Sequence, residues 1–316
     1  MVEGMHPRQS FPPAVNDLLR DQVGVVTALQ LESAGVSKSV RRRMVADGTL
    51  RRLGRGVFAS GQVSLHGRAH AGLLAAAQRD VAPAVGGWHA LHLWGAVVDE
   101  TRLKQPMQIW VDDLNSRINR CGWNYRRDGY QRLERARGFP RLISREDAVL
   151  DVCNGLREER CVGTLLDFLR EGVARGTTLK ALLADRLRHR HRSLIQDICS
   201  DAASGVDSAL ELRYRDCEAL HGLPTPERQV FVGPGPVDVW FREFRLVIQL
   251  DGWAFHKDRI RKDARDDAIR AGMNIVTLRF GWEDIVSRPC QTMRMIADVL
   301  STNGWTGSLT PCPMCP

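Results

Sequence analysis

Val237-Asp238-Val239-Trp240-Phe241 and Leu246-Val247-Ile248-Gln249-Leu250-Asp251-Gly252-Trp253-Ala254-Phe255-His256 are the two runs that decide the fold of this chain. Both are rich in β-branched and aromatic residues, and four residues separate them, which predicts two neighbouring strands. Successive side chains of a strand point to opposite faces, so Gln249 and Asp251 share one face and the apolar even-numbered residues share the other. A polar pair on an otherwise apolar strand indicates a site, and Asp238 lies on the preceding strand across the turn between the two.

The elements around these two strands can be read from residue 205 onward. We expect a helix over 206–221, a strand over 228–233, a turn at Gly233-Pro234-Gly235-Pro236, a helix over 258–271 and a final strand over 274–280. A strand, a helix and a further strand in succession predict a crossover and hence a parallel pair. The expected order is αβββαβ, within an α/β (α+β) fold class.

The acids of this region suit phosphodiester hydrolysis. That reaction needs a hard cation that neutralises the phosphate and activates water, and carboxylates bind such cations. We therefore expect Asp238 and Asp251 to bind Mg²⁺ or Mn²⁺, with Glu211 holding a metal-bound water or a second ion. The amide of Gln249 and a proton-transferring His256 complete the expected catalytic set. The basic residues expected to contact the DNA backbone here are Lys257, Arg261, Lys262, Arg265 and Arg270.

Seven short motifs in this order resemble a known family. They are Ser208-Ala209-Leu210-Glu211, Gly222-Leu223-Pro224-Thr225-Pro226-Glu227-Arg228-Gln229, Val237-Asp238, Leu250-Asp251-Gly252, Phe255-His256, Asp263-Ala264-Arg265 and Leu278-Arg279-Phe280. Together they are similar to the very-short-patch-repair (Vsr) endonuclease-like domain of the PD-(D/E)XK nuclease superfamily, over roughly residues 205–300. The resemblance implies a restriction-endonuclease-like fold and metal-dependent DNA cleavage. It also implies that Glu211, Asp238, Asp251 and His256 are the functional residues.

One position departs from that family. The family usually has Glu-x-Asp-Gly where this chain has Gln249-Leu250-Asp251-Gly252. An amide offers a carbonyl oxygen without a negative charge, so a cation held there loses electrostatic attraction. Two interpretations follow: the site works with a weaker metal and the remaining carboxylates, or it has lapsed into DNA binding without cutting. A third treats Asp238 and Asp251 as ordinary acids at strand ends.

The N-terminal sixty residues predict a winged helix-turn-helix. Helix signals cover 16–23 and 27–34, a turn follows at Gly35, and Ser37 is placed as the N-cap of a helix to Asp47. Basic and apolar residues then alternate around two glycines over 50–58, which favours a β-hairpin. Gly48–Phe58 is similar to the G-L-x-R-L-x-R-G-V-[YF] wing of AbiEi-type antitoxins, with Thr49 inserted. The resemblance covers about 45 residues and implies DNA binding.

Positive charge is concentrated in this segment. Seven basic residues and one acid, Asp47, occupy 38–55, a net charge of +6. The basic residues are Lys38, Arg41, Arg42, Arg43, Arg51, Arg52 and Arg55. We expect them to contact phosphates or base edges in a major groove. The alternative is a solvated basic face on a protein-interaction domain.

The composition of the whole chain bounds the class of protein. Its 316 residues, 43% hydrophobic, suit two or three domains, and a net charge of +8 favours a polyanionic partner. The expected domains are 1–61 (winged helix), 62–204 (mainly helical, role unknown), 205–302 (nuclease-like) and a tail, 303–316. With neither a membrane-spanning run nor the pattern of a signal peptide, we expect a cytoplasmic protein that binds double-stranded DNA. A homodimer and a toxin or defence-system partner are further expectations.

The histidines, cysteines and arginines of three other segments are less decisive. Cys312-Pro-Met-Cys315 has the spacing of half a zinc ribbon but lacks a second pair nearby in sequence, so we expect a frayed tail. His89 and His92 have metal-ligand spacing, although ordinary core or surface histidines are the stronger expectation. The run Arg186–Arg192 extends the DNA-binding surface or forms a solvated helix end. The leading function is a metal-dependent DNA endonuclease, with an antitoxin-like regulator or a protein-interaction module as alternatives.

Overall fold

The computed structural model describes residues 11–76, 82–113, 122–200, 209–251 and 257–313, with the backbone alone described for 257–261. The chain forms two compact units, Met1–Val152 and Cys153–Pro316. The domain boundaries expected at 61/62, 204/205 and 302/303 lie inside these units and stay predictions. Within the described part of the chain, no helix combines the length and the apolar character that crossing a membrane requires.

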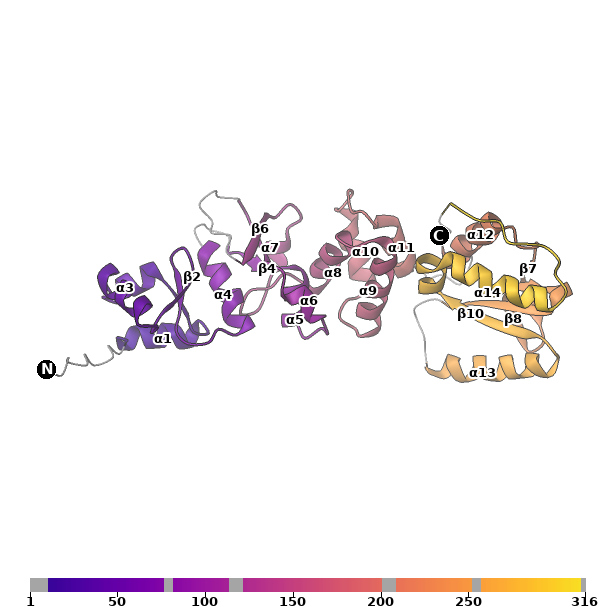
Figure 1. Ribbon diagram of the computed structural model, residues 1–316, viewed down its shortest axis with the longest axis horizontal. Helices are drawn as coiled ribbons and strands as arrows, with labels where there is room; N and C mark the ends of the chain where they lie inside the picture. The colour runs from indigo at the N-terminus through magenta and orange to yellow at the C-terminus, as the bar shows by residue number, and fades with distance from the viewer. Residues whose placement is uncertain (1–10, 77–81, 114–121, 201–208, 252–256, 314–316) are drawn as a thin grey trace. The chain divides into compact units, whose positions relative to one another are not determined.

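The first unit begins with a winged helix (Figure 1). Its elements are α1 (Pro13–Asp21), β1 (Val25–Thr27), α2 (Ala28–Ser33), α3 (Lys38–Ala46), β2 (Arg51–Gly54) and β3 (Val57–Ala59). The strands form an antiparallel sheet in the order β1-β3-β2. The helix-turn-helix and the hairpin are confirmed. The first helix begins three residues earlier than expected, and β1 is a strand that we did not predict because three residues carry too little periodicity.

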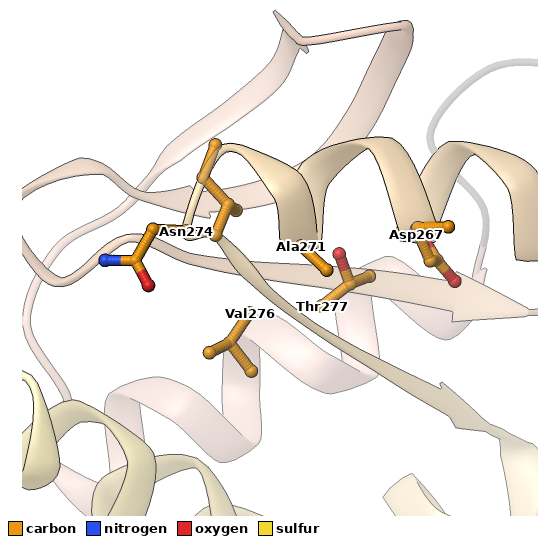
Figure 2. A pocket seen from close by; sticks show the side chains of 7 residues that line it. Asp267, Ala271, Asn274, Val276 and Thr277 are labelled. Atoms are coloured by element: carbon orange, nitrogen blue, oxygen red, sulfur yellow. The ribbon is translucent and has the colours of Figure 1, made fainter.

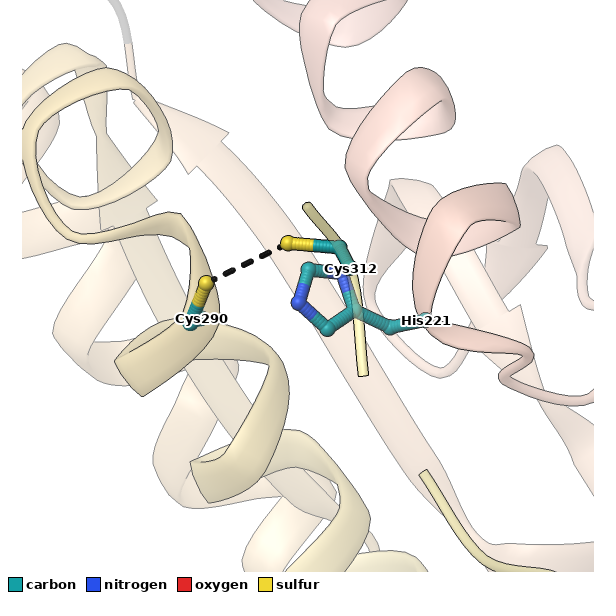
Figure 3. A group of neighbouring side chains, drawn as sticks. All are labelled: His221, Cys290 and Cys312. Atoms are coloured by element: carbon teal, nitrogen blue, oxygen red, sulfur yellow. Dashed lines mark hydrogen bonds between the residues drawn. The ribbon is translucent and has the colours of Figure 1, made fainter. Parts of the chain in front are cut away.

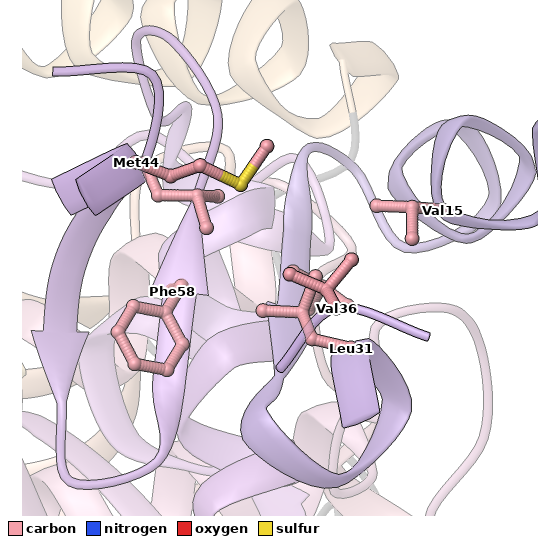
Figure 4. Close-up of a cluster of buried hydrophobic side chains, with 7 residues drawn as sticks. Val15, Leu31, Val36, Met44 and Phe58 are labelled. Atoms are coloured by element: carbon pink, nitrogen blue, oxygen red, sulfur yellow. The ribbon is translucent and has the colours of Figure 1, made fainter. Parts of the chain in front are cut away.

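Local sequence signals explain where these helices begin. Thr27 and Gln30 form a reciprocal capping box at the start of α2, and the Ser37 hydroxyl accepts the N–H of Val40 at the start of α3. Gly35 has a φ of +84°, which permits the sharp turn between the two helices. The helices and the hairpin enclose a small core in which the apolar side chains converge (Figure 4). The core residues are Val15, Val26, Leu31, Val36, Met44, Leu50 and Phe58.

The remainder of the first unit surrounds a second small sheet. Its elements are α4 (Leu65–Ala76), β4 (Ala84–Val85), α5 (Gly87–Leu93), α6 (Glu100–Leu103), β5 (Met107–Val111), β6 (Trp123–Arg127), α7 (Arg132–Arg135) and α8 (Arg145–Asn154), which ends beyond the unit boundary. The sheet order is β4-β5-β6, with β5 and β6 parallel. His89 is buried, with Nε2 3.1 Å from the Leu103 carbonyl oxygen, while His92 is exposed. The expectation of ordinary histidines is therefore confirmed.

The second unit begins with helices α9 (Glu158–Arg170), α10 (Gly176–Ala184) and α11 (Arg192–Ser200). The basic run Arg186–Arg192 links α10 to α11, and Arg186, His189 and His191 within it are buried. His191 Nε2 lies 2.9 Å from the Leu156 carbonyl oxygen. Both interpretations of this run, as a solvated or a DNA-facing surface, were thus wrong for these three residues, because their side chains are shielded from solvent.

A four-stranded sheet forms the rest of the second unit. Its elements are α12 (Ala209–His221), β7 (Glu227–Val232), β8 (Gly235–Phe241), η1 (Arg242–Phe244), β9 (Leu246–Asp251), α13 (Lys257–Gly272), β10 (Val276–Gly281), η2 (Glu283–Ser287) and α14 (Pro289–Thr302). The strand order is β10-β9-β8-β7, with β10 parallel to β9 and the other pairs antiparallel. Figure 1 shows α13 on one side of the strands and α12 and α14 on the other. The predicted αβββαβ order is observed, and α14 follows it.

Candidate functional site

The basic residues of the winged helix cover α3 and the hairpin that follows it. Six of the seven predicted side chains are exposed to solvent. These are Lys38, Arg42, Arg43, Arg51, Arg52 and Arg55. Met44 fixes the orientation of α3 because it is buried in the small core, which turns Arg42 and Arg43 outward. This basic surface can contact a polyanion without unfolding anything beneath it.

Arg41 differs from its neighbours on α3. Its side chain is half-buried, Nη1 donates to the Ala28 carbonyl oxygen at 3.3 Å, and the guanidinium lies 5.7 Å from the centre of the Phe58 ring. A cation over an aromatic face is attracted by the ring quadrupole. Arg41 therefore joins α2, α3 and β3 and contributes to the fold of the winged helix.

Two of the predicted acids, Glu211 and Asp238, are linked by Gln229, a residue to which we had assigned no role. Gln229 Nε2 donates to Glu211 Oε2 at 2.9 Å and to Asp238 Oδ1 at 3.4 Å. The pairing of Arg228 with Val239 and of Val230 with Val237 places Gln229 opposite Asp238 on β8. Gln229 adopts a φ of +50°, an uncommon conformation that interrupts strand alternation. For that reason alternation could not assign its side chain to a face.

Asp238 is the centre of this acidic cluster, which we define as Glu211, Gln229, Asp238 and Asp251. Its Oδ2 accepts the backbone N–H of Leu250 at 2.7 Å. Burial raises the pKa of Asp238 above its ordinary value, and the nearby carboxylates of Glu211 and Asp251 raise it further. The hydrogen bonds from Leu250 and Gln229 oppose this rise. The cluster thus concentrates negative charge that a cation would stabilise.

Asp251 is neutralised by an arginine of the same unit. Arg279 Nη1 lies 3.2 Å from Asp251 Oδ1, and the same guanidinium is 2.8 Å from Asp267 and 3.5 Å from Asp263. Arg279 on β10 pairs in register with Gln249 on β9, so the parallel strands hold both side chains next to each other. The predicted shared face of Gln249 and Asp251 agrees with their partial exposure between buried residues of β9.

Gln249 is held by the backbone of the neighbouring strand. Its Nε2 donates to the Pro236 carbonyl oxygen at 3.2 Å. The predicted His256 lies outside the described residues, as do the side chains of Lys257 and Arg261. Lys262 and Arg265 on α13 are exposed.

Arg270 does not fit the role that we expected for it. It is buried, and its guanidinium bonds to the Val232 carbonyl oxygen at 3.2 Å and to Asp267 at 3.0 Å. Because both contacts are internal, the prediction that Arg270 contacts DNA was wrong.

A hollow of about 480 Å³ adjoins this region between the end of α13 and the start of β10 (Figure 2). It is lined by Asp267, Ala268, Ala271, Asn274, Ile275, Val276 and Thr277. Asp267 also binds Arg279, so the hollow shares one acid with the charge network of Asp251. The other lining residues carry no titratable group, and none of them is a predicted site residue.

The donor atoms of the acidic cluster suit a hard divalent cation. Carboxylate oxygens are what Mg²⁺ and Mn²⁺ prefer, and Asp238 and Glu211 supply them. Asp251 belongs to the same charge environment, although Arg279 already pairs with it. The residues therefore fit such an ion best at Asp238 and Glu211.

Comparison with known protein families gives a match for the N-terminal segment. Residues 13–61 match a family model described as "Transcriptional regulator, AbiEi antitoxin". These residues run from the start of α1 to just beyond β3, which is the complete winged helix. No curated protein matches the chain. The N-terminal segment is therefore similar to the winged helix of AbiEi antitoxin transcriptional regulators, as its wing sequence predicted.

Proposed function

We propose that the protein is a DNA-binding transcriptional regulator of the AbiEi antitoxin type, which binds double-stranded DNA through its winged helix. The observation that carries this proposal is the exposed basic surface on α3 and the hairpin, within the segment that matches the AbiEi family model. Six exposed cations gathered on one helix and one hairpin match the charge of a DNA backbone.

We assign different roles to the two basic parts of the winged helix. The second helix of a helix-turn-helix, here α3, enters the major groove, where Arg42 and Arg43 can contact base edges or phosphates. The hairpin that follows carries Arg51, Arg52 and Arg55, which contact the phosphates that flank the groove. Affinity should therefore depend strongly on salt, because each neutralised phosphate releases condensed counterions.

The experiment is a fluorescence-anisotropy titration with the full chain and a labelled duplex taken from upstream of its own coding region. We expect R42A/R43A to weaken binding by about ten-fold or more and to reduce the slope of log affinity against log salt by about 2. The matched control is Arg170→Ala, since Arg170 is an exposed arginine on α9 of the other unit. Equal affinity for wild type and R42A/R43A would overturn the proposal.

Two further parts of this proposal concern partners. The matched family is described as an antitoxin, which suggests a toxin or defence-system protein as partner of this chain. A helix-turn-helix protein that reads two symmetric half-sites acts as a dimer. We propose both for this chain, in the cytoplasm. Sedimentation of the purified protein with and without operator duplex tests the dimer.

A second candidate function is metal-dependent DNA cleavage by the second unit. The observation in its favour is the acidic cluster, where burial and neighbouring carboxylates raise the pKa of Asp238. Asp238 and Glu211 would hold Mg²⁺ or Mn²⁺, with Asp251 beside them, and the ion when bound would activate water and neutralise the phosphate. Gln229 orients the carboxylates of Glu211 and Asp238, and Arg279 balances the charge of Asp251.

Plasmid and mismatched duplexes incubated with Mn²⁺ test this second function. We expect chelator-sensitive cleavage that D238A abolishes, and a higher rate for Q249E, because glutamate restores a negative charge beside the cation. If wild type and Q249E both bind the duplex but leave the DNA uncut, the nuclease function is overturned and only the regulator function remains. The two functions are thus tested separately, since one measures binding and the other strand scission.

A further inference from the structure

The second unit brings together three side chains that are far apart in sequence. Ligand atoms of His221, Cys290 and Cys312 all lie within 4.8 Å of one another. Figure 3 shows the imidazole ring and the two sulfur atoms pointing toward one another, each from a different segment. His221 and Cys312 are buried, with 2% and 6% of their surfaces exposed, and Cys290 is partly buried.

The hydrogen bond of His221 sets which of its nitrogens can bind a metal. Nδ1 lies 2.7 Å from the carbonyl oxygen of Cys217, one turn earlier on α12. A carbonyl oxygen only accepts hydrogen bonds, so Nδ1 carries the proton and Nε2 is the unprotonated nitrogen of the neutral ring. Metal-binding histidines usually make this type of bond, because it holds the ring in place and fixes its tautomer.

The two thiols lie at a separation that suits a shared metal. Cys290 Sγ and Cys312 Sγ are 3.5 Å apart. Two thiolates on a tetrahedral zinc ion, with Zn–S bonds of about 2.3 Å, lie about 3.8 Å apart. Thiolate and imidazole together are the donors that zinc prefers, whereas Mg²⁺ and Mn²⁺ prefer oxygen.

Backbone contacts bring the C-terminal segment to this position. Thr310 donates its N–H to the carbonyl oxygen of His221, the last residue of α12, at 2.9 Å, and Cys312 follows Thr310 by two residues. Gly222, with a φ of +67°, allows this approach, because a Cβ there would lie 2.8 Å from the Thr310 hydroxyl. Cys290 is the second residue of α14. Three segments therefore deliver one ligand each.

We propose that His221 Nε2, Cys290 Sγ and Cys312 Sγ bind Zn²⁺, and that the ion fastens the C-terminal segment to α12 and α14. Three ligands from separate segments, two of them buried, suit an ion that holds these segments together. The proposal does not depend on DNA binding or cleavage.

The test measures zinc in the purified full chain after dialysis against metal-free buffer, by plasma mass spectrometry. We expect about one zinc per chain in the wild type and less than about one fifth of that in H221A, C290S and C312S. The matched control is Cys199→Ser, a buried cysteine on α11 outside the group, which should keep its zinc. Full zinc content in H221A, C290S and C312S would overturn the proposal.

A second measurement keeps the proposal falsifiable if a variant fails to fold. Wild-type protein reloaded with Co²⁺ should show near-ultraviolet absorption from thiolate-to-cobalt charge transfer and the visible bands of a tetrahedral ion. Zinc at background level in the wild type, or absence of these bands, would overturn the site. A disulfide between Cys290 and Cys312 in freshly purified protein, seen as the mass of a linked peptide, would also overturn it.

Discussion

Arg279 holds Asp251 through both carboxylate oxygens, with Nη1 3.2 Å from Oδ1 and 3.3 Å from Oδ2. The same guanidinium contacts Asp263 and Asp267 on α13, so one arginine balances acids from a strand and a helix. At Asp238, by contrast, the group that lies between it and Glu211 is the neutral amide of Gln229. In the acidic cluster, the negative charge of Asp251 is therefore balanced by Arg279, whereas the group that bridges Asp238 and Glu211 brings no positive charge.

Replacing Arg279 should destabilise the second unit. Arg279→Ala leaves three partly buried carboxylates without their shared cation, and we expect a loss of about 3 kcal/mol in the free energy of unfolding. Arg279→Lys should recover part of this loss, since a single ammonium cannot reach all three acids with the geometry of a guanidinium. Urea denaturation measures the change. Arg265→Ala, an exposed arginine on α13, is the control, and an equal effect of both alanine variants would contradict the prediction.

Asp238 should make stability fall as the pH rises. Because its pKa is higher in the folded protein than in the unfolded chain, the folded state binds more protons between the two values. The free energy of unfolding therefore decreases as the pH rises from the ordinary aspartate pKa through the raised one. Asp238→Asn keeps an oxygen that can accept the Leu250 N–H and removes this titration. Between acid and neutral pH, the free energy of unfolding of the variant should rise relative to that of the wild type, as denaturation at each pH would show. An unchanging difference between the two proteins would contradict the prediction.

Arg41 and Arg42 are adjacent in sequence and should separate stability from DNA affinity. Arg41→Ala removes contacts with Ala28 and Phe58, so we expect a lower thermal midpoint of the first unit. Arg42→Ala removes an exposed charge, so stability should change by less than about 0.5 kcal/mol while DNA affinity falls. Thermal unfolding and anisotropy on both variants check the pair. Equal thermal midpoints and equal DNA affinities of the two variants would show that the contacts of Arg41 do not stabilise the winged helix.

Met44 anchors α3 in the core of the winged helix. Met44→Ala should cost about 3 kcal/mol, because the side chain is 2% exposed and its removal leaves a cavity. Val45→Ala is the matched control on the next residue, which is 36% exposed and should change stability little. Hydrogen exchange of α3 amides reports the loss locally. Equal protection of the α3 amides from exchange in the two variants would contradict the prediction that Met44 anchors this helix.

Much of the fold could be predicted because its signals are local. The capping residues Thr27 and Ser37 mark helix starts, and the alternation around Gln249 and Asp251 identifies β9 and its two faces. The boundaries at β1 and α1 were less predictable, since short elements depend on pairing with partners elsewhere in the chain. The role of Gln229 could not be predicted, because a positive φ removes the regularity on which strand patterns rest.

The sequence by itself determined the winged helix, its concentration of basic residues and the αβββαβ order of the second unit, since periodicity, caps and charge density are properties of neighbouring residues. Only the tertiary structure decided which of the distant residues meet. It bound Arg41 and Arg270 to groups of their own units, paired Arg279 with Asp251, and gathered His221, Cys290 and Cys312 from three segments. The physical reason is that such meetings depend on strand order and on how helices pack across the sheet, which no local pattern records.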